Sequence, residues 1–326
     1  MVRRGDWATD ADALQAASWN GILSARELVR LGVPERTVYR RTQQDGPWTL
    51  LLPATLMLTN GTPTPLQHET AALVRGGESA MLTGLSGARH HGLRRGGDPA
   101  FDHVLIPLEH RALSTGRARF ERTVRLPRPR LRDGLPVAPL PRCIVDHIRR
   151  LKDHEEIAAV VTEAVQRAMV VLDELWLELE LGPRKGSAAP RRVLEAAGAG
   201  VLSPAEFTAR DFWEAFDDLP PMEWNVSVYD ENGHFLATVD GLVKEFGFVW
   251  EIDSVEHHLA TPEQVRETLA RQRRLRAVGL HVLGSRPRQR TDDPRGLHED
   301  LLAHLAVAAA LPPARVLYGP GPALAG

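Results

Sequence analysis

A single cysteine and the absence of long apolar runs set the first limits on this chain. Of its 326 residues only Cys143 is a cysteine, which excludes an internal disulfide and a zinc cluster built on cysteine. No run of about 18 apolar residues occurs, so we expect no membrane span and no membrane partner. The first residues, MVRRGDWATDADAL, turn acidic before any apolar segment, unlike a secretory signal. These absences indicate a protein of the reducing cytoplasm.

The chain also lacks the net positive charge that is typical of nucleic-acid-binding proteins. Its 40 lysines and arginines are balanced by 42 aspartates and glutamates. The positive charge is nevertheless concentrated in places, because segment 111–132 contains eight arginines and only one acidic residue, Glu121. Two interpretations of this segment stay open. It is either a solvated hairpin face or a strip that contacts phosphates.

Residues 19–60 have the pattern of a helix, a turn, a second helix and a strand pair. Ser24 is suited to cap a first helix over residues 25–31. Pro34 is suited to the first position of a second helix that runs to about Gln44. The apolar stretch that follows, WTLLLPATLMLT, predicts two strands interrupted by a proline. This order is typical of a winged helix-turn-helix.

The second helix of this motif is basic on its outward face. Val33 and Val38 are spaced to face inward. The residues that then face outward on neighbouring turns are Arg36, Thr37, Arg40 and Arg41. Arginines bind guanine edges and phosphates in a major groove, and a small hydroxyl fits between them. We expect these side chains to bind double-stranded DNA, although a plain three-helix packing unit would have the same caps.

Four segments follow one another in the first half of the chain. They read ARELVRLGVPERTVYRRTQQDGPW, MLTGLSGARHHGL, FDHVLIP and DGLPVAPLPRCIVDHIRR. Their order resembles the AbiEi family of bacterial type IV antitoxins, over about the first 150 residues. The resemblance implies a winged helix-turn-helix followed by an α/β antitoxin-like domain. It also implies a DNA-binding autorepressor of a toxin operon, with a cognate toxin protein as partner.

Residues 203–326 predict strands between helices, as in an α/β sandwich. SPAEF begins a helix, and WNVSVYDENGHFLATVDGLV predicts a hairpin that turns at Asn232-Gly233. FGFVWEID follows as a third strand, TPEQVRETLARQRRLRAVG as a basic helix and LHVLGSR as a fourth strand. Helices on both sides of such strands are typical of a layered α/β domain.

The third strand of this region carries two carboxylates on one face. One face holds Phe248, Trp250 and Ile252, and the other holds Val249, Glu251 and Asp253. Two carboxylates on an otherwise apolar strand repel each other and are costly to bury, and a divalent cation would remove that cost. Asp240, at the end of the preceding strand, can supply a third oxygen ligand. Hard oxygen ligands without a thiol favour Mg²⁺ or Mn²⁺.

The spacing of Asp240, Glu251 and Asp253 resembles the active-site core of PD-(D/E)xK nucleases, and is closest to the Vsr-like branch. The resemblance implies that Asp240 and Glu251 hold the metal, and that Glu206 and Asp253 complete a catalytic set. It also implies DNA contacts from the following helix, by Arg271, Arg273 and Arg274. The lysine of the general motif is replaced by Asp253, which puts catalysis in question more than the fold.

Each of these carboxylates also has a structural interpretation. Glu206 follows Ser203 at the spacing of a capping box. Asp240 precedes a glycine, as in a turn. The two carboxylates of the third strand can pair with helix arginines, for instance Arg271 or Arg274. Metal binding and these structural roles both stay open at this point.

We therefore expect an α+β multidomain protein with a restriction-endonuclease-like C-terminal domain. The expected parts are a winged helix-turn-helix (1–60), an AbiEi-like middle domain with closing helices (61–181), a linker (182–202) and the Vsr-like domain (203–326). Two functions stay open: a DNA-binding regulator of the antitoxin type, or a metal-dependent DNA endonuclease or nickase in repair or phage defence. A protein that only holds a toxin is a third possibility.

Overall fold

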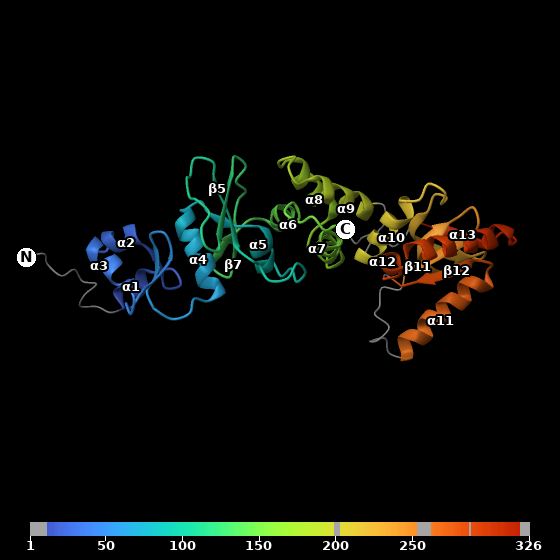
Figure 1. The fold of residues 1–326 in the computed structure, drawn as a ribbon, viewed down its shortest axis with the longest axis horizontal. Coiled ribbons are helices and arrows are strands. Elements are labelled where there is room, and N and C mark those ends of the chain that lie inside the picture. The colour runs from blue at the N-terminus through green and yellow to red at the C-terminus, as the bar shows by residue number, and fades with distance from the viewer. Residues whose placement is uncertain (1–11, 199–202, 253–261, 287, 320–326) are drawn as a thin grey trace, which may run out of the picture. The chain divides into compact units, whose positions relative to one another are not determined.

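The computed structural model describes residues 12–198, 203–252, 262–286 and 288–319. The chain divides into two units, residues 1–150 and 151–326. Each unit combines helices with a five-stranded sheet, and the first contains a further three-stranded sheet (Figure 1). An α+β multidomain class is therefore confirmed. Among the described helices, none has the length and apolar character needed to cross a membrane.

The first unit begins with short helices beside a three-stranded antiparallel sheet. Their bounds are α1 (Ala13–Ala17), β1 (Ile22–Ser24), α2 (Ala25–Arg30), α3 (Glu35–Arg40), β2 (Thr49–Leu52) and β3 (Thr55–Met57). The strand order is β1-β3-β2. Ser24 caps α2 in a capping box with Glu27, which satisfies amides that the helix leaves free. Val33 and Val38 are buried in the core of this region, as the sequence predicts.

Helix α3 is shorter than the sequence predicts, because it ends at Arg40 instead of near Gln44. The backbone turns at Asp45, whose φ of 63° lies in the left-handed region. The Trp48 amide then donates to the Arg41 carbonyl oxygen at 3.1 Å, which fixes the return of the chain toward β2. A helix continued past Arg41 would lose this bond.

A mixed five-stranded sheet forms the rest of the first unit. Its elements are α4 (Pro65–Gly76), β4 (Met81–Leu82), α5 (Gly84–His90), β5 (Asp102–Pro107), β6 (Ala118–Thr123), β7 (Arg130–Arg132), β8 (Leu135–Val137) and α6 (Leu140–Ile148). The strand order is β6-β5-β4-β8-β7. Gly76 of α4 lies against Ile106, whereas Gly84 of α5 lies against His103. Since neighbouring residues of β5 alternate in side, α4 and α5 cover opposite faces (Figure 1).

The domain boundaries differ from those expected. Helix α4 packs against strands of both sheets in the first unit, so residue 60 is not a clean division. The helices that follow residue 150 belong to the second unit and not to the middle domain. Residues 182–202 contain a further helix, α9 (Ala188–Gly198), with Val193 and Leu194 buried. Packing of this apolar face makes most of the expected linker a structural part of the unit.

The second unit consists of three helices followed by a sheet with helices on both faces. Its elements are α7 (His154–Gln166), α8 (Leu172–Glu180), α9, α10 (Pro204–Glu214), β9 (Glu223–Asp230), β10 (Phe235–Val243), β11 (Phe248–Ile252), α11 (Pro262–Ala277), β12 (His281–Ser285), α12 (Gln289–Asp292), α13 (Pro294–Ala310) and β13 (Val316–Gly319). The strand order is β12-β11-β10-β9-β13. Among the described strands of this sheet, β11 and β12 are paired in parallel and the other neighbours are antiparallel, and α11 connects β11 to β12 (Figure 1).

The two faces of β11 are those that the alternation predicts. Phe248, Trp250 and Ile252 pack in one core with residues of α10 and α13. Val249 packs in a second core with Leu275 of α11. The predicted hairpin is also present, with β9 and β10 joined at Gly233, where a φ of 82° favours glycine. The sheet thus presents one face to α10 and α13 and the other to α11.

His90 provides a test of the packing in the first unit. Its ring nitrogens lie 2.9 Å from Glu69 Oε2 and 2.6 Å from Asp133 Oδ2. The hydrogen bond to Glu69 is the largest cause that raises the pKa of His90 to about 9 from 6.5. A raised pKa stabilises the fold fully below pH 6.5, and this stabilisation is lost as the pH rises through about 9.

We predict that His90→Phe lowers the free energy of unfolding more at pH 6 than at pH 9.5. The difference between the two pH values is up to roughly 3 kcal/mol, at ~1.4 kcal/mol per pKa unit. Urea unfolding of both proteins across this pH range measures it. An equal loss at both pH values would show that the charge on His90 contributes nothing.

Candidate functional site: a polar row and two arginine surfaces

Three neighbouring strands of the second unit carry a row of polar side chains. The register of β9 with β10 pairs Val239 with Val226 and Gly241 with Trp224, which places Asn225 opposite Asp240. The register of β10 with β11, continued by one residue, places Asp240 opposite Glu251. The Asp240 carboxylate accepts a hydrogen bond from the Ile252 amide at 2.7 Å, in place of a backbone partner. Asp240 lies inside β10, not at its end as the sequence suggested.

Glu206 joins this row from helix α10. The Ser203 hydroxyl accepts from the Glu206 amide at 3.1 Å and caps the helix. The Glu206 carboxylate accepts from the Asn225 side-chain amide at 2.6 Å. Asn225 is buried and has a φ of 52°, a conformation that asparagine tolerates better than most residues. Asn225 was not predicted as a site residue, although an amide within the apolar strand segment WNVSV is a signal for it.

Glu251 is the most deeply buried member of the row, at 1% exposure. One of its oxygens, Oε2, accepts a hydrogen bond from the Arg271 guanidinium of α11. The other, Oε1, is buried and has no hydrogen-bond partner among the described residues. The structure therefore contains the ion pair that the sequence analysis left open as an alternative to metal binding. Neither Arg273 nor Arg274 shares this contact, since both are exposed.

The row offers two adjacent carboxylates for a cation. Within the described ranges, no group of three or more His, Cys, Asp or Glu side chains is close enough to hold a metal. Asp253, the other expected member of the catalytic set, lies outside the described residues. Mg²⁺ keeps several waters and is usually bound by one or two carboxylates. Asp240 and Glu251 provide the two carboxylates of such a site. Glu251 Oε1 has no hydrogen-bond partner among the described residues, so its lone pairs are available to a cation.

The basic residues of α3 form a first arginine surface. Arg36 and Arg40 are exposed, and neither has an ion-pair partner among the residues that the structure describes. Thr37 is half-buried between them. Arg41 differs, because its guanidinium lies 4.9 Å from the centre of the Trp48 ring. Arg36 and Arg40 are thus the members of the expected set that are most available to a ligand.

Segment 111–132 does not form one hairpin face, so that interpretation is wrong. Its strands β6 and β7 lie at opposite edges of the five-stranded sheet. At the β6 edge, Arg117 donates to the Pro99 carbonyl oxygen at 3.0 Å and Arg119 to that of Gly116 at 2.8 Å. At the β7 edge, Arg130 and Arg132 are exposed and unpaired within the described part of the chain. The second arginine surface is therefore the β7 edge.

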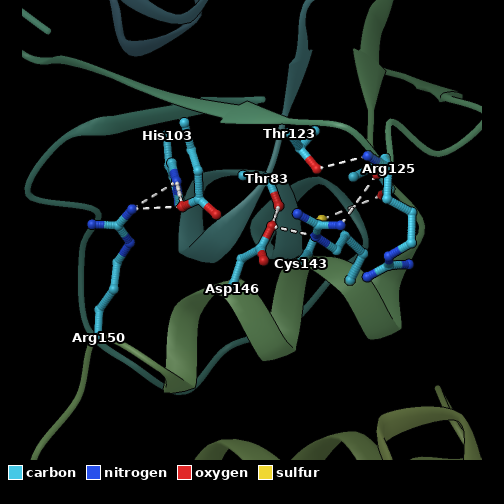
Figure 2. A network of polar contacts seen from close by, with 10 residues as sticks. Thr83, His103, Thr123, Arg125, Cys143, Asp146 and Arg150 are labelled. Atoms are coloured by element: carbon cyan, nitrogen blue, oxygen red, sulfur yellow. Dashed lines mark hydrogen bonds and ion pairs between the residues drawn. The ribbon is translucent and has the colours of Figure 1, made fainter. Parts of the chain in front are cut away.

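The sequence analysis also missed a polar network beneath the sheet of the first unit (Figure 2). His103 Nε2 lies 3.0 Å from Glu121 Oε2, and Arg150 donates to the same oxygen at 2.7 Å. The hydrogen bond with His103 is the largest cause that lowers the pKa of Glu121 to about 2. These contacts join β5 and β6 to the segment that follows α6, and His103, at 1% exposure, is the buried member of the group.

Asp146 forms the other half of the network. It accepts hydrogen bonds from the Thr83 hydroxyl at 2.7 Å and from Arg142 at 2.8 Å (Figure 2). Burial raises the pKa of Asp146, and the charge of Arg142 opposes that change. The Thr83 hydroxyl attaches α6 to the residue that follows β4, and the buried Arg142–Asp146 ion pair lies within α6. We assign the whole network to structural stability, because its central groups are out of reach of solvent.

Comparisons with known proteins give a similarity to a solved structure. No protein-family model matches the chain, and no curated protein matches it. Among solved structures, the chain is similar to the RV2827C protein from Mycobacterium tuberculosis, with a TM-score of 0.41 and 18% sequence identity. The match covers 64% of this chain and 82% of that chain. The function proposed below therefore depends on the residues of this chain alone.

The arginines at the two edges of the five-stranded sheet differ in the dependence of DNA affinity on salt that we expect from them. If the β7 edge contacts DNA, Arg130→Gln with Arg132→Gln reduces the slope of log affinity against log salt by up to about 1.8, at ~0.9 per phosphate. The matched control is Arg117→Gln with Arg119→Gln at the other edge, and we expect it to leave the slope unchanged. Fluorescence anisotropy with a DNA duplex, measured at salt concentrations from roughly 50 to 300 mM, gives both slopes. Equal slopes in wild type and the β7 variant would remove this edge from the interface.

Proposed function

We propose that the protein is a DNA-binding regulator of the AbiEi antitoxin type, with a nuclease-like C-terminal domain. The observation that carries the proposal is the exposure of Arg36 and Arg40 on α3 without an ion-pair partner. Exposed arginines without a carboxylate partner retain their full charge and all donors for a ligand. The order of α2, α3 and the β2–β3 hairpin supports a winged helix-turn-helix.

In this proposal α3 enters the major groove of double-stranded DNA. Arg36 and Arg40 lie one turn apart, so that both guanidiniums can bind base edges or phosphates along one groove. Arg26 and Arg30 of α2 are exposed as well, and suit the phosphate backbone beside the groove. The β2–β3 hairpin contains no lysine or arginine, so the charged contacts fall to the two helices.

The proposal includes a partner and a place of action. By the resemblance of its first 150 residues, the protein represses the promoter of its own operon and has a cognate toxin protein as partner. A DNA-bound regulator of this kind acts in the bacterial cytoplasm. The absence of a membrane-crossing helix among the described residues agrees with this location.

The α3 arginines give the direct test of this function. We predict that Arg36→Ala with Arg40→Ala weakens binding to the DNA upstream of the gene by roughly 2–4 kcal/mol, at ~1–3 kcal/mol per base contact. The control is Arg184→Ala with Lys185→Ala, which removes the same charge from exposed positions between α8 and α9. Gel-shift titration of the three proteins measures the effect. Unchanged binding in the α3 variant, or an equal loss in the control, would contradict the proposal.

A second candidate function is a metal-dependent DNA endonuclease or nickase. The observation that favours it is the buried Glu251 Oε1 without a partner, beside Asp240. An unsatisfied buried carboxylate oxygen is costly, and persists where a ligand satisfies it. Asp240 and Glu251 would hold Mg²⁺ or Mn²⁺, with Glu206 and Asp253 as the further members of the catalytic set.

In such a nuclease, other residues of the second unit would hold the carboxylates in place and contact the DNA. When bound, the cation supplies a Lewis acid for the scissile phosphate and activates a water. Glu206 orients Asn225 at the end of the row through its 2.6 Å hydrogen bond. The Ile252 amide holds the Asp240 carboxylate in place. Arg273 and Arg274, exposed on α11, are placed to approach the DNA backbone.

Metal binding and cleavage can be tested separately on the full-length protein. We predict that millimolar Mn²⁺ raises the Tm by mass action, by about 2.7 kcal/mol of stability at a hundredfold excess over Kd. Glu251→Gln abolishes the rise, and the control Glu245→Gln, at an exposed position of the β10–β11 turn, retains it. If the cation serves chemistry, wild type and Glu245→Gln nick supercoiled plasmid and Glu251→Gln does not. A Tm rise without nicking supports the regulator, and no Tm rise removes the metal site.

A further inference from the structure

The two oxygens of Glu251 lie in different surroundings. Oε2 accepts from Arg271, whereas Oε1 is buried without a partner among the described residues. A carboxylate that is 1% exposed needs a positive partner, because desolvation of an unpaired charge is very costly. Arg271 is the residue that supplies this charge in the structure. It neutralises one side of the carboxylate and leaves the other side open.

The Arg271 guanidinium can move away from the Glu251 carboxylate. Its side chain is 36% exposed, so its guanidinium lies at the boundary between the sheet and solvent. Helix α11 holds it in place through Leu275, which lies one turn further on and is buried against the sheet. The residues of α11 from Arg266 to Ala270 are mostly exposed. A long side chain on such a helix can turn from the carboxylate to solvent while the helix stays packed.

We propose that Arg271 is the exchangeable counterion of the metal site: it occupies Glu251 while no cation is bound, and a divalent cation displaces it. This inference rests on the metal site of the second proposed function. The displaced Arg271 guanidinium stays on the face of α11 that is turned toward the polar row. From there it pairs with a DNA phosphate. Arg271 thereby couples the state of the carboxylates to DNA, which Arg273 and Arg274 cannot do from their exposed positions.

The exchange has a measurable consequence for affinity. A cation at Glu251 Oε1 lies close to the guanidinium at Oε2, and the two positive charges repel each other, so part of its binding free energy is consumed in displacing Arg271. Removal of Arg271 leaves Glu251 without any counterion, and the metal-free protein then becomes less stable. Metal binding should therefore become tighter in Arg271→Met than in wild type, by about tenfold or more. Stability of the same variant should depend more steeply on the metal concentration.

The test is a titration of the full-length protein with Mn²⁺, followed by electron paramagnetic resonance of the free ion. The matched control is Arg274→Met, which removes the same charge from an exposed position of the same helix. We expect a Kd for Mn²⁺ about tenfold lower in Arg271→Met than in Arg274→Met. Arg271→Lys, which retains the charge with fewer donors, should lie between wild type and Arg271→Met, and serves if the methionine variant does not fold.

The outcomes separate this inference from the functions on which it depends. Equal Mn²⁺ affinity in Arg271→Met and Arg274→Met overturns the counterion exchange but leaves the metal site intact. Weaker affinity in Arg271→Met overturns it as well, since Arg271 would then support the site instead of competing for it. No Mn²⁺ binding in any protein removes both the metal site and the exchange. In that case, the DNA affinity of the α3 arginines still decides the regulator function.

Discussion

Burial of the Glu251 carboxylate on an inner strand is the constraint on which the polar row of the second unit depends. Its strand alternates between two apolar cores, and the Glu251 side chain is only 1% exposed. The charge is tolerated only because α11 brings a guanidinium to it. The neighbouring carboxylates are held in another way, by an Ile252 amide at Asp240 and an Asn225 side chain at Glu206. Each carboxylate is therefore positioned by a different element of the fold.

Arginines have three different roles in this protein, and their partners distinguish the roles. Arg142 is buried and forms an ion pair with Asp146 within one helix, α6. Arg36 and Arg40 are exposed and unpaired among the described residues, as a ligand-binding surface requires. Arg271 is intermediate, because it is paired but partly exposed. A net charge of -2 conceals these differences, which appear only when each guanidinium is assigned its partner.

Local sequence patterns predicted most of the helices and strands. The features that these patterns did not predict depend on contacts between residues far apart in the sequence. Alternation in FGFVWEID predicted both faces of β11, since side-chain direction along a strand depends on neighbours alone. The Ser24 cap and the Gly233 turn are equally local. The row itself required the register of three strands, so Asn225 could not be placed beside Asp240 from spacing. The same reason explains segment 111–132, whose arginines were divided between two sheet edges by strand order and not by sequence distance.

The parallel pairing of β11 with β12 has a consequence for the order of folding. β9, β10 and β11 form an antiparallel meander with short connections, which closes at little entropic cost. β12 pairs with β11 only after α11 has crossed the sheet, because a parallel pair needs such a crossover. Until α11 docks on this meander, the Glu251 carboxylate has no guanidinium partner. Docking of α11 therefore buries the carboxylate and brings its guanidinium to it in the same step.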